Sequence, residues 1–150
     1  MPKHLGNLTV TAENALSFPA VTEFYGHLTL QAGVRLFVPS LVSIRGWLTL
    51  LEGSELVVGN LGRIEGWLMM RNQSKLDAPN LTAVTEDVVR YASEMGTGKL
   101  TSVGSLQVQR GAHLTMAVTG VKRGVSLASD SWLTANHLEK VGGSITLKEN

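Results

Sequence analysis

Residues 26–65 read GHLTLQAGVRLFVPSLVSIR and then GWLTLLEGSELVVGNLGRIE, two consecutive units of twenty residues that share one pattern. Each unit has the form G-x-L-x-Φ, five variable residues, and then L-x-Φ-(P/G)-x-Φ-x-x-Φ-x, where Φ is an apolar residue. The units before and after keep the same phase, so that glycine recurs at positions 6, 26, 46 and 66. A fixed repeat of this length is the signature of a repeat architecture rather than of an ordinary globular domain.

Within each unit, apolar residues alternate with other residues at two places. Leu28 and Leu30 are two residues apart, and a period of two predicts a β-strand with both side chains pointing into a core. Leu36 and Val38 repeat this spacing, and Pro39 then ends the strand because proline cannot donate to a strand ladder. A third apolar pair closes the unit. Equal units with inward apolar residues at a fixed phase predict a parallel solenoid, in which each coil rests on the coil before it.

The pattern returns after a blurred stretch and continues to the last residues given. Gly104 and Gly143 open further units, the last of which contains one strand. Units such as LVSIRGWLTLLEGSEL (41–56) and LEKVGGSITLKEN (138–150) resemble the parallel β-solenoids of receptor L domains and of the short leucine-rich repeats found in many bacterial and phage proteins. The resemblance and the general rule for parallel crossovers imply right-handed coils. We expect an all-β, right-handed parallel β-solenoid (β-helix) of about seven 20-residue coils plus a terminal strand, in a single domain over residues 1–150.

The composition of the 150 residues excludes several classes of protein. With 43% hydrophobic and 17% charged residues, the chain can bury a core. Its 13 Lys and Arg against 12 Asp and Glu leave a net charge of +1, which does not favour nucleic acid or an acidic partner. There is no cysteine for a disulfide or a thiolate metal site. Because no apolar run could span a membrane and the first residues lack a secretory signal, we expect a cytoplasmic protein, of the producing cell or of a phage host.

The repeat blurs in the stretch that follows the fourth unit. An unbroken phase would place Val88 and Arg90 inside, and an unpaired guanidinium is costly to bury. A shift of one residue, absorbed by a bulge at residues 85–86, would place Val89 and Tyr91 inside instead, because such a shift turns every side chain to the other side of a strand. We therefore expect the side chains of Val88 and Arg90 on the surface.

The same stretch is expected to lose its second strand. Residues 96–99, Gly-Thr-Gly-Lys, would form a loop in its place. An irregular coil in a regular array is either a functional loop or a tolerated deletion. On the functional interpretation, this loop is a second candidate contact surface for a partner, formed by Glu94, Met95, Thr97 and Lys99.

The strongest functional signal lies on the outward side of the first strand of each unit. With the expected shift, one outward column contains Asn7, His27, Trp47, Trp67 and Val88, and the next contains Thr9, Thr29, Thr49, Met69 and Arg90. Clustered apolar surface marks interfaces, where Trp, Met and Arg are enriched. The predicted protein-binding residues are Trp47, Trp67, Met69, Leu51, Thr49, Val88 and Arg90. The alternative is a structural ladder, in which the two tryptophans stack.

These features predict a non-catalytic protein–protein interaction module. The resemblance implies a small phage or bacterial inhibitor that binds and blocks a protein machine. A homodimer is a second form of the same prediction, formed through the strand face or through the C-terminal edge strand, where Gly143–Asn150 would leave a coil uncovered. We expect no membrane partner.

Two other functions remain as alternatives. Large β-solenoids include enzymes that act on polysaccharides, and such an enzyme would depend on carboxylates such as Glu52 or Glu65 facing each other across a cleft. Turns this short build no cleft walls, so we expect no enzyme and no cofactor. A nucleic-acid binder would use the basic flank at residues 88–123, but no exposed aromatic platform is evident there. The four histidines fall at different phases of the repeat, so no metal site is expected.

Overall fold

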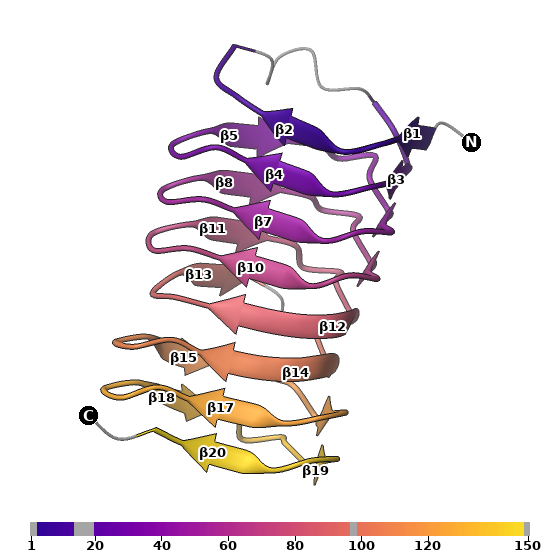
Figure 1. Cartoon of the computed structure of the whole chain (residues 1–150). Coiled ribbons are helices and arrows are strands. Elements are labelled where there is room, and N and C mark those ends of the chain that lie inside the picture. Colours follow the sequence, from indigo (N-terminus) through magenta and orange to yellow (C-terminus); the bar gives the residue numbers. More distant parts are fainter. Residues whose placement is uncertain (1–2, 14–19, 97–98, 149–150) are drawn as a thin grey trace.

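The computed structural model of the chain describes residues 3–13, 20–96 and 99–148. The chain forms a parallel β-solenoid of about seven turns, whose coils follow each other about 20 residues apart (Figure 1). Leu28 pairs with Leu48, and Leu48 with Leu68, in an unbroken parallel register. The all-β parallel solenoid predicted from the repeat is therefore confirmed.

The strands of the described residues form three faces. The first face contains β2 (Leu8–Val10), β4 (Leu28–Leu30), β7 (Leu48–Leu50), β10 (Leu68–Met70), β12 (Ala83–Arg90), β14 (Ser102–Val108), β17 (Val125–Leu127) and β20 (Ile145–Leu147). The second face contains β5 (Arg35–Phe37), β8 (Glu55–Val57), β11 (Lys75–Asp77), β13 (Glu94–Gly96), β15 (His113–Thr115) and β18 (Trp132–Thr134). The third face contains β1 (Lys3–Leu5), β3 (Glu23–Tyr25), β6 (Ser43–Ile44), β9 (Arg63–Ile64), β16 (Gly120–Val121) and β19 (Lys140–Val141). The long strands β12 and β14 extend over both the third and the first face.

The core is a set of aliphatic columns that run along the solenoid. Leu28, Leu48 and Leu68 form one such column, and each is fully buried. Leu36 and Leu56 belong to a column on the second face and are also buried. Because apolar side chains of one coil lie against apolar side chains at the same positions of the next along these columns, burial of apolar surface stabilises each coil through its neighbours.

The predicted register of β12 is wrong. Leu68 pairs with Val88 and Met70 pairs with Arg90, so the side chains of Val88 and Arg90 point inward in the unbroken phase, and Arg90 is only 3% exposed. The guanidinium is not left without partners, because its Nη2 donates to the backbone oxygen of Ser93 at 2.8 Å and its Nε donates to Ser93 Oγ at 3.3 Å. Burial lowers the pKa of Arg90 to about 10.

The expected bulge is present, but its consequence differs. Val84 pairs with Val103 and Asp87 pairs with Ser105, so residues 85 and 86 together face one residue of β14. That residue is Gly104, and a Cβ there would overlap the carbonyl oxygens of Thr85 and Glu86. Because the bulge lies between β12 and the following coil, it leaves the register against β10 unchanged.

The expected loss of the second strand is also wrong. Residues Glu94–Gly96 form β13, and Leu76 of β11 pairs with Met95. The irregularity lies before this strand, where three residues join β12 to β13 and four residues join β10 to β11. Of the predicted loop, residues 97–98 lie outside the described residues.

Candidate functional site

The outward side of the first face holds a stacked ladder of rings. The rings of His27 and Trp47 stack with centroids 3.8 Å apart, and those of Trp47 and Trp67 stack at 4.2 Å with an interplanar angle of 8°. The ladder is fixed at its start by polar contacts, since the backbone nitrogen of His27 donates to Asn7 Oδ1 at 2.9 Å and that of Trp47 donates to His27 Nδ1 at 3.1 Å. Trp47 is half-buried between its neighbours and thus has a structural role.

Trp67 ends this ladder and is 38% exposed. Because Leu68 pairs with Val88, the residue next to Trp67 in the column is Asp87 and not Val88. The Asp87 carboxylate accepts hydrogen bonds from Ser105 Oγ at 2.7 Å and from Arg123 Nη2 at 2.7 Å. The Ser105 hydrogen bond, together with Arg123, holds the pKa of Asp87 below its usual range. The exposed indole therefore lies beside an anchored charge pair.

The neighbouring column and its flank complete the surface. In the second column, Thr49 is followed by Met69 and then by Val89, because Met69 pairs with both Thr49 and Val89. On the flank, the Arg71 guanidinium lies over the Tyr91 ring at 4.8 Å from its centroid. We call the tryptophan face the set of these half-buried or exposed residues: Trp47, Thr49, Leu51, Trp67, Met69, Arg71, Val89 and Tyr91.

The structure brings together five of the seven predicted binding residues, namely Trp47, Trp67, Met69, Thr49 and Leu51. Val88 and Arg90 lie in the core and leave the set. Their places on the surface are taken by Asp87 and Val89, and Tyr91, which was expected inside, lies on the flank. The unbroken twenty-residue spacing from Trp67 to Asp87 was the signal that would have identified these three residues.

The second predicted surface is only partly outward-facing. Glu94 forms an ion pair with Lys75 at 3.5 Å, and Lys99 Nζ donates to Asn80 Oδ1 at 3.0 Å. Met95 is half-buried in an inward position, in the same column as Leu76. Thr97 lies outside the described residues.

The carboxylates named for an enzyme do not share a site. Glu52 lies in the turn between β7 and β8, whereas Glu65 lies between β9 and β10, which is another corner of the coil. Glu52 lines a hollow of about 440 Å³ with Ala32, Leu51 and Arg71. Glu65 forms an ion pair with Arg45 at 3.3 Å. This arrangement does not provide two carboxylates facing each other across a cleft.

The cations of the basic flank are mostly engaged with other groups. Arg90 is buried, Arg110 lies 3.9 Å from Asp130, and Arg123 contacts Asp87 and Glu86. Carboxylates thus neutralise Arg110 and Arg123, and burial removes Arg90 from the surface, which leaves Lys99 and Lys122 as the cations of this flank for phosphate groups. Within the described part of the chain, no group of three or more His, Asp or Glu residues could hold a metal ion. A helix long and apolar enough to cross a membrane is likewise absent from the described residues.

Comparison with known proteins adds no relative from which a function could be carried over. No protein-family model matches the chain. Neither the curated proteins nor the solved structures give a match. The functional argument for this parallel β-solenoid therefore rests on the geometry of its own residues.

Proposed function

We propose that the chain is a non-catalytic protein-interaction module that binds its partner through the tryptophan face. The observation that carries this proposal is the position of Trp67, which ends a stacked ladder with 38% of its surface exposed and with Met69 on the adjacent strand column. Tryptophan and methionine are enriched at the centres of protein interfaces, and tryptophan is the residue most often found as an energetic hot spot.

The ladder prepares Trp67 for binding. Its ring is stacked on Trp47, which is itself stacked on His27, and each of the three residues directly precedes one of the paired strands β4, β7 and β10. A side chain that is already ordered loses little conformational entropy when a partner covers it. The stacked ladder that was the structural alternative is thus compatible with binding, because it immobilises the exposed indole at its end, Trp67.

The surroundings of Trp67 have the layout of an interface with an apolar centre and a polar rim. Met69, Val89 and Leu51 supply apolar surface near the ring. Arg71, stacked on Tyr91, and Arg123, paired with Asp87, supply charge at the edges. Rim charges of this kind select partners and their orientation more than they add affinity.

For the partner, we propose a component of a bacterial protein machine that the module binds and blocks in the cytoplasm. This finer proposal rests on the resemblance of the coils to the short leucine-rich repeats of bacterial and phage proteins. A second copy of the chain is the alternative occupant of the same face. Glu52 and Glu65 lie at different corners of the coil and do not face each other across a cleft. This separation favours a binding function over polysaccharide cleavage.

The test compares substitutions at two exposed tryptophans, each of which is stacked on a neighbouring ring. Trp67→Ser removes the indole from the tryptophan face, whereas Trp132→Ser removes an indole that is 59% exposed and stacked on His113 at 3.6 Å on the second face. Light scattering over a concentration series, followed by capture from a bacterial lysate and titration of the captured protein, measures binding. We expect only Trp67→Ser to lose the partner, or to convert a dimer into a folded monomer. Equal binding by both variants would contradict the proposal.

A further inference from the structure

The second face is interrupted between β13 and β15. Strands β5, β8, β11 and β13 form one sheet and β15 and β18 form another. On the first face of the same two coils, β12 and β14 are directly paired. Among the described residues, no backbone hydrogen bond joins β13 to β15, and most of their Cα atoms lie more than 8 Å apart, farther than in the paired strands. The two coils therefore touch along one face and separate along the other (Figure 1).

A local hydrogen bond accompanies the interruption. In regular coils, the first amide of a second-face strand donates to the carbonyl that precedes the neighbouring strand, as Lys75 N does to Ser54 O at 2.8 Å and Glu94 N does to Ser74 O at 2.9 Å. By this pattern, His113 N would donate to Ser93 O. Instead, Ser93 O accepts a hydrogen bond from Arg90 Nη2 at 2.8 Å. The buried guanidinium thus occupies the carbonyl with which the next strand would begin to pair.

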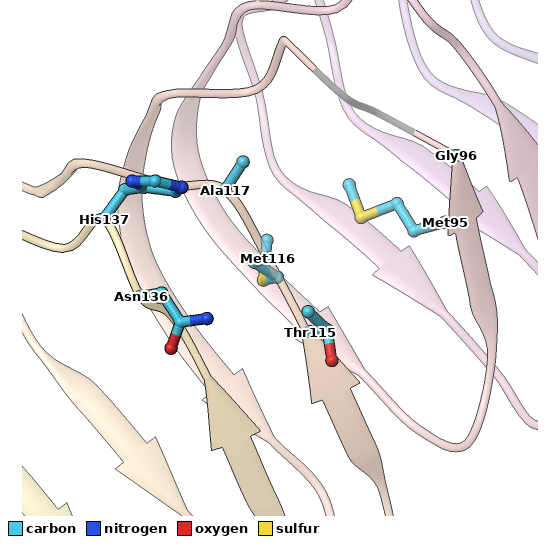
Figure 2. Close-up of a pocket in the computed structure, with 7 residues that line it drawn as sticks. All are labelled: Met95, Gly96, Thr115, Met116, Ala117, Asn136 and His137. Carbon is cyan, nitrogen blue, oxygen red and sulfur yellow. The ribbon is translucent and has the colours of Figure 1, made fainter.

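A cavity of about 420 Å³ lies at this interruption, and we call it the slot (Figure 2). Met95 extends from β13 into it, opposite Met116 and Ala117, and its mouth is bordered by Thr115, Asn136 and His137. Met95 stands in the inward column of Leu56 and Leu76, which are fully buried, yet it is only half-buried itself. The slot therefore exposes an apolar position of the core.

We propose that the slot is a second binding site, which takes an extended peptide segment of a partner protein as an added strand between β13 and β15. The segment would place one aliphatic side chain of leucine or methionine size against Met95, Met116 and Ala117. This site lies on the second face and is independent of the tryptophan face.

The two edges and the lining determine this occupant. Within the described ranges, β13 is paired only with β11, and β15 only with β18, so each strand has one edge directed toward the slot. A strand edge is completed by the backbone of an extended peptide, and side-chain pockets beside it select every second residue. Two methionines and an alanine form an apolar lining, and methionine adapts its shape to different aliphatic side chains. The described residues that line the slot include no Lys, Arg, Asp or Glu, so a neutral segment fits.

The probe is a labelled nine-residue peptide with the sequence of residues 72–80, NQSKLDAPN, because this chain already uses that segment as a second-face strand with Leu76 inward. The control peptide carries Leu76→Asp. We expect fluorescence anisotropy to show binding of the first peptide and about ten-fold or greater weakening for the second, because the buried leucine side chain is lost. Hydrogen exchange should slow at β13 and β15 when the first peptide is bound.

Three variants of the full chain make the test specific. Met95→Asp and Ala117→Glu place a charge in the slot from opposite sides, and each should weaken peptide binding while circular dichroism shows a folded chain. Met69→Asp changes a half-buried methionine of the tryptophan face and should leave peptide binding unchanged. The proposal is overturned if the two peptides bind equally, if protection falls on β20 or β5 instead, or if both folded slot variants bind as the unaltered chain does.

Discussion

The regular coils and the coil at residues 85–103 solve the same packing problem in different ways. In the regular coils, most inward positions hold an apolar side chain, and the strands of every face pair with the next coil. In the irregular coil, an arginine occupies a core position, the turn between first and second faces is one residue shorter, and the second face is open. The first face nevertheless continues without a break through β10, β12 and β14.

This difference shows that the faces of a solenoid need not be equally cooperative. β12 and β14, at eight and seven residues, are the longest strands of the chain's described part, and they carry the pairing across the irregular coil. The irregularity is therefore concentrated on the second face, where one strand edge remains open on each side of the slot. A repeat protein whose coils contact only their neighbours can tolerate such a defect because its effect does not spread along the array.

The largest expected effect on the free energy of unfolding comes from truncating one side chain of the same inward column in each of the two regions. Leu56 and Met95 occupy equivalent inward positions, but Leu56 is fully buried and Met95 is not. Leu56→Ala should lower the free energy of unfolding by about 2–5 kcal/mol, since it leaves a cavity. Met95→Ala should cost about 1 kcal/mol or less, because water already reaches that side chain. Urea unfolding of the three proteins measures both changes, and equal losses would mean that the slot is closed in solution.

Much of the fold could be predicted from the sequence because the repeat encodes it directly. Glycine, leucine and proline at fixed phase determine the coil length, the inward columns and the strand ends, and the pairing of Leu28 with Leu48 follows from that phase. The stack of Trp47 on Trp67 follows for the same reason. Such regularities depend only on spacing, and spacing is visible without a structure.

The structure of the irregular coil could not be predicted because it depends on local hydrogen bonds that are specific to this coil. The cost of burying an unpaired guanidinium favoured an outward Arg90, but Ser93, three residues later, supplies two acceptors for it. The repeat pattern does not predict that a turn residue will supply hydrogen-bond acceptors to a buried side chain. Consequently Val88 and Arg90 were assigned to the binding surface, and Asp87, Val89 and Tyr91 were missed.

An intermediate effect on the free energy of unfolding is expected when Arg90 is replaced by an apolar residue like its neighbours in the inward column. Its neighbours in that column, Met70 and Val108, are buried apolar residues. Arg90→Met should raise the free energy of unfolding by about 1–3 kcal/mol, because no carboxylate compensates the buried charge. The substitution also releases Ser93 O, so the amide of His113 should exchange more slowly if β15 then pairs with β13.

The pH dependence of this effect has a defined sign. The pKa of Arg90 is lowered by burial to about 10, well below its value in an unfolded chain, so the charged form is disfavoured in the folded state. The advantage of Arg90→Met should be full below pH 10 and should shrink as the pH rises above 10. Met70→Arg, the reverse change one coil earlier, should destabilise the chain. An unchanged or lower stability of Arg90→Met would show that the guanidinium is a net stabilising group.

The smallest expected effect concerns the charge pair beside Trp67. The pKa of Asp87 is held below 3.8, first by the Ser105 hydrogen bond and then by Arg123, so its ionised form stabilises the folded chain above that pH. This contribution should disappear as the pH falls below 3.8 and through the lowered value. Because the Asp87 side chain is 31% exposed and its partner is on the surface, Asp87→Asn should cost only about 0.5 kcal/mol at neutral pH and nothing in strong acid. Urea unfolding at both pH values, with Glu86→Gln as the matched control, decides the point: a loss that persists in acid would assign Asp87 a role in the backbone of the bulge rather than an electrostatic one.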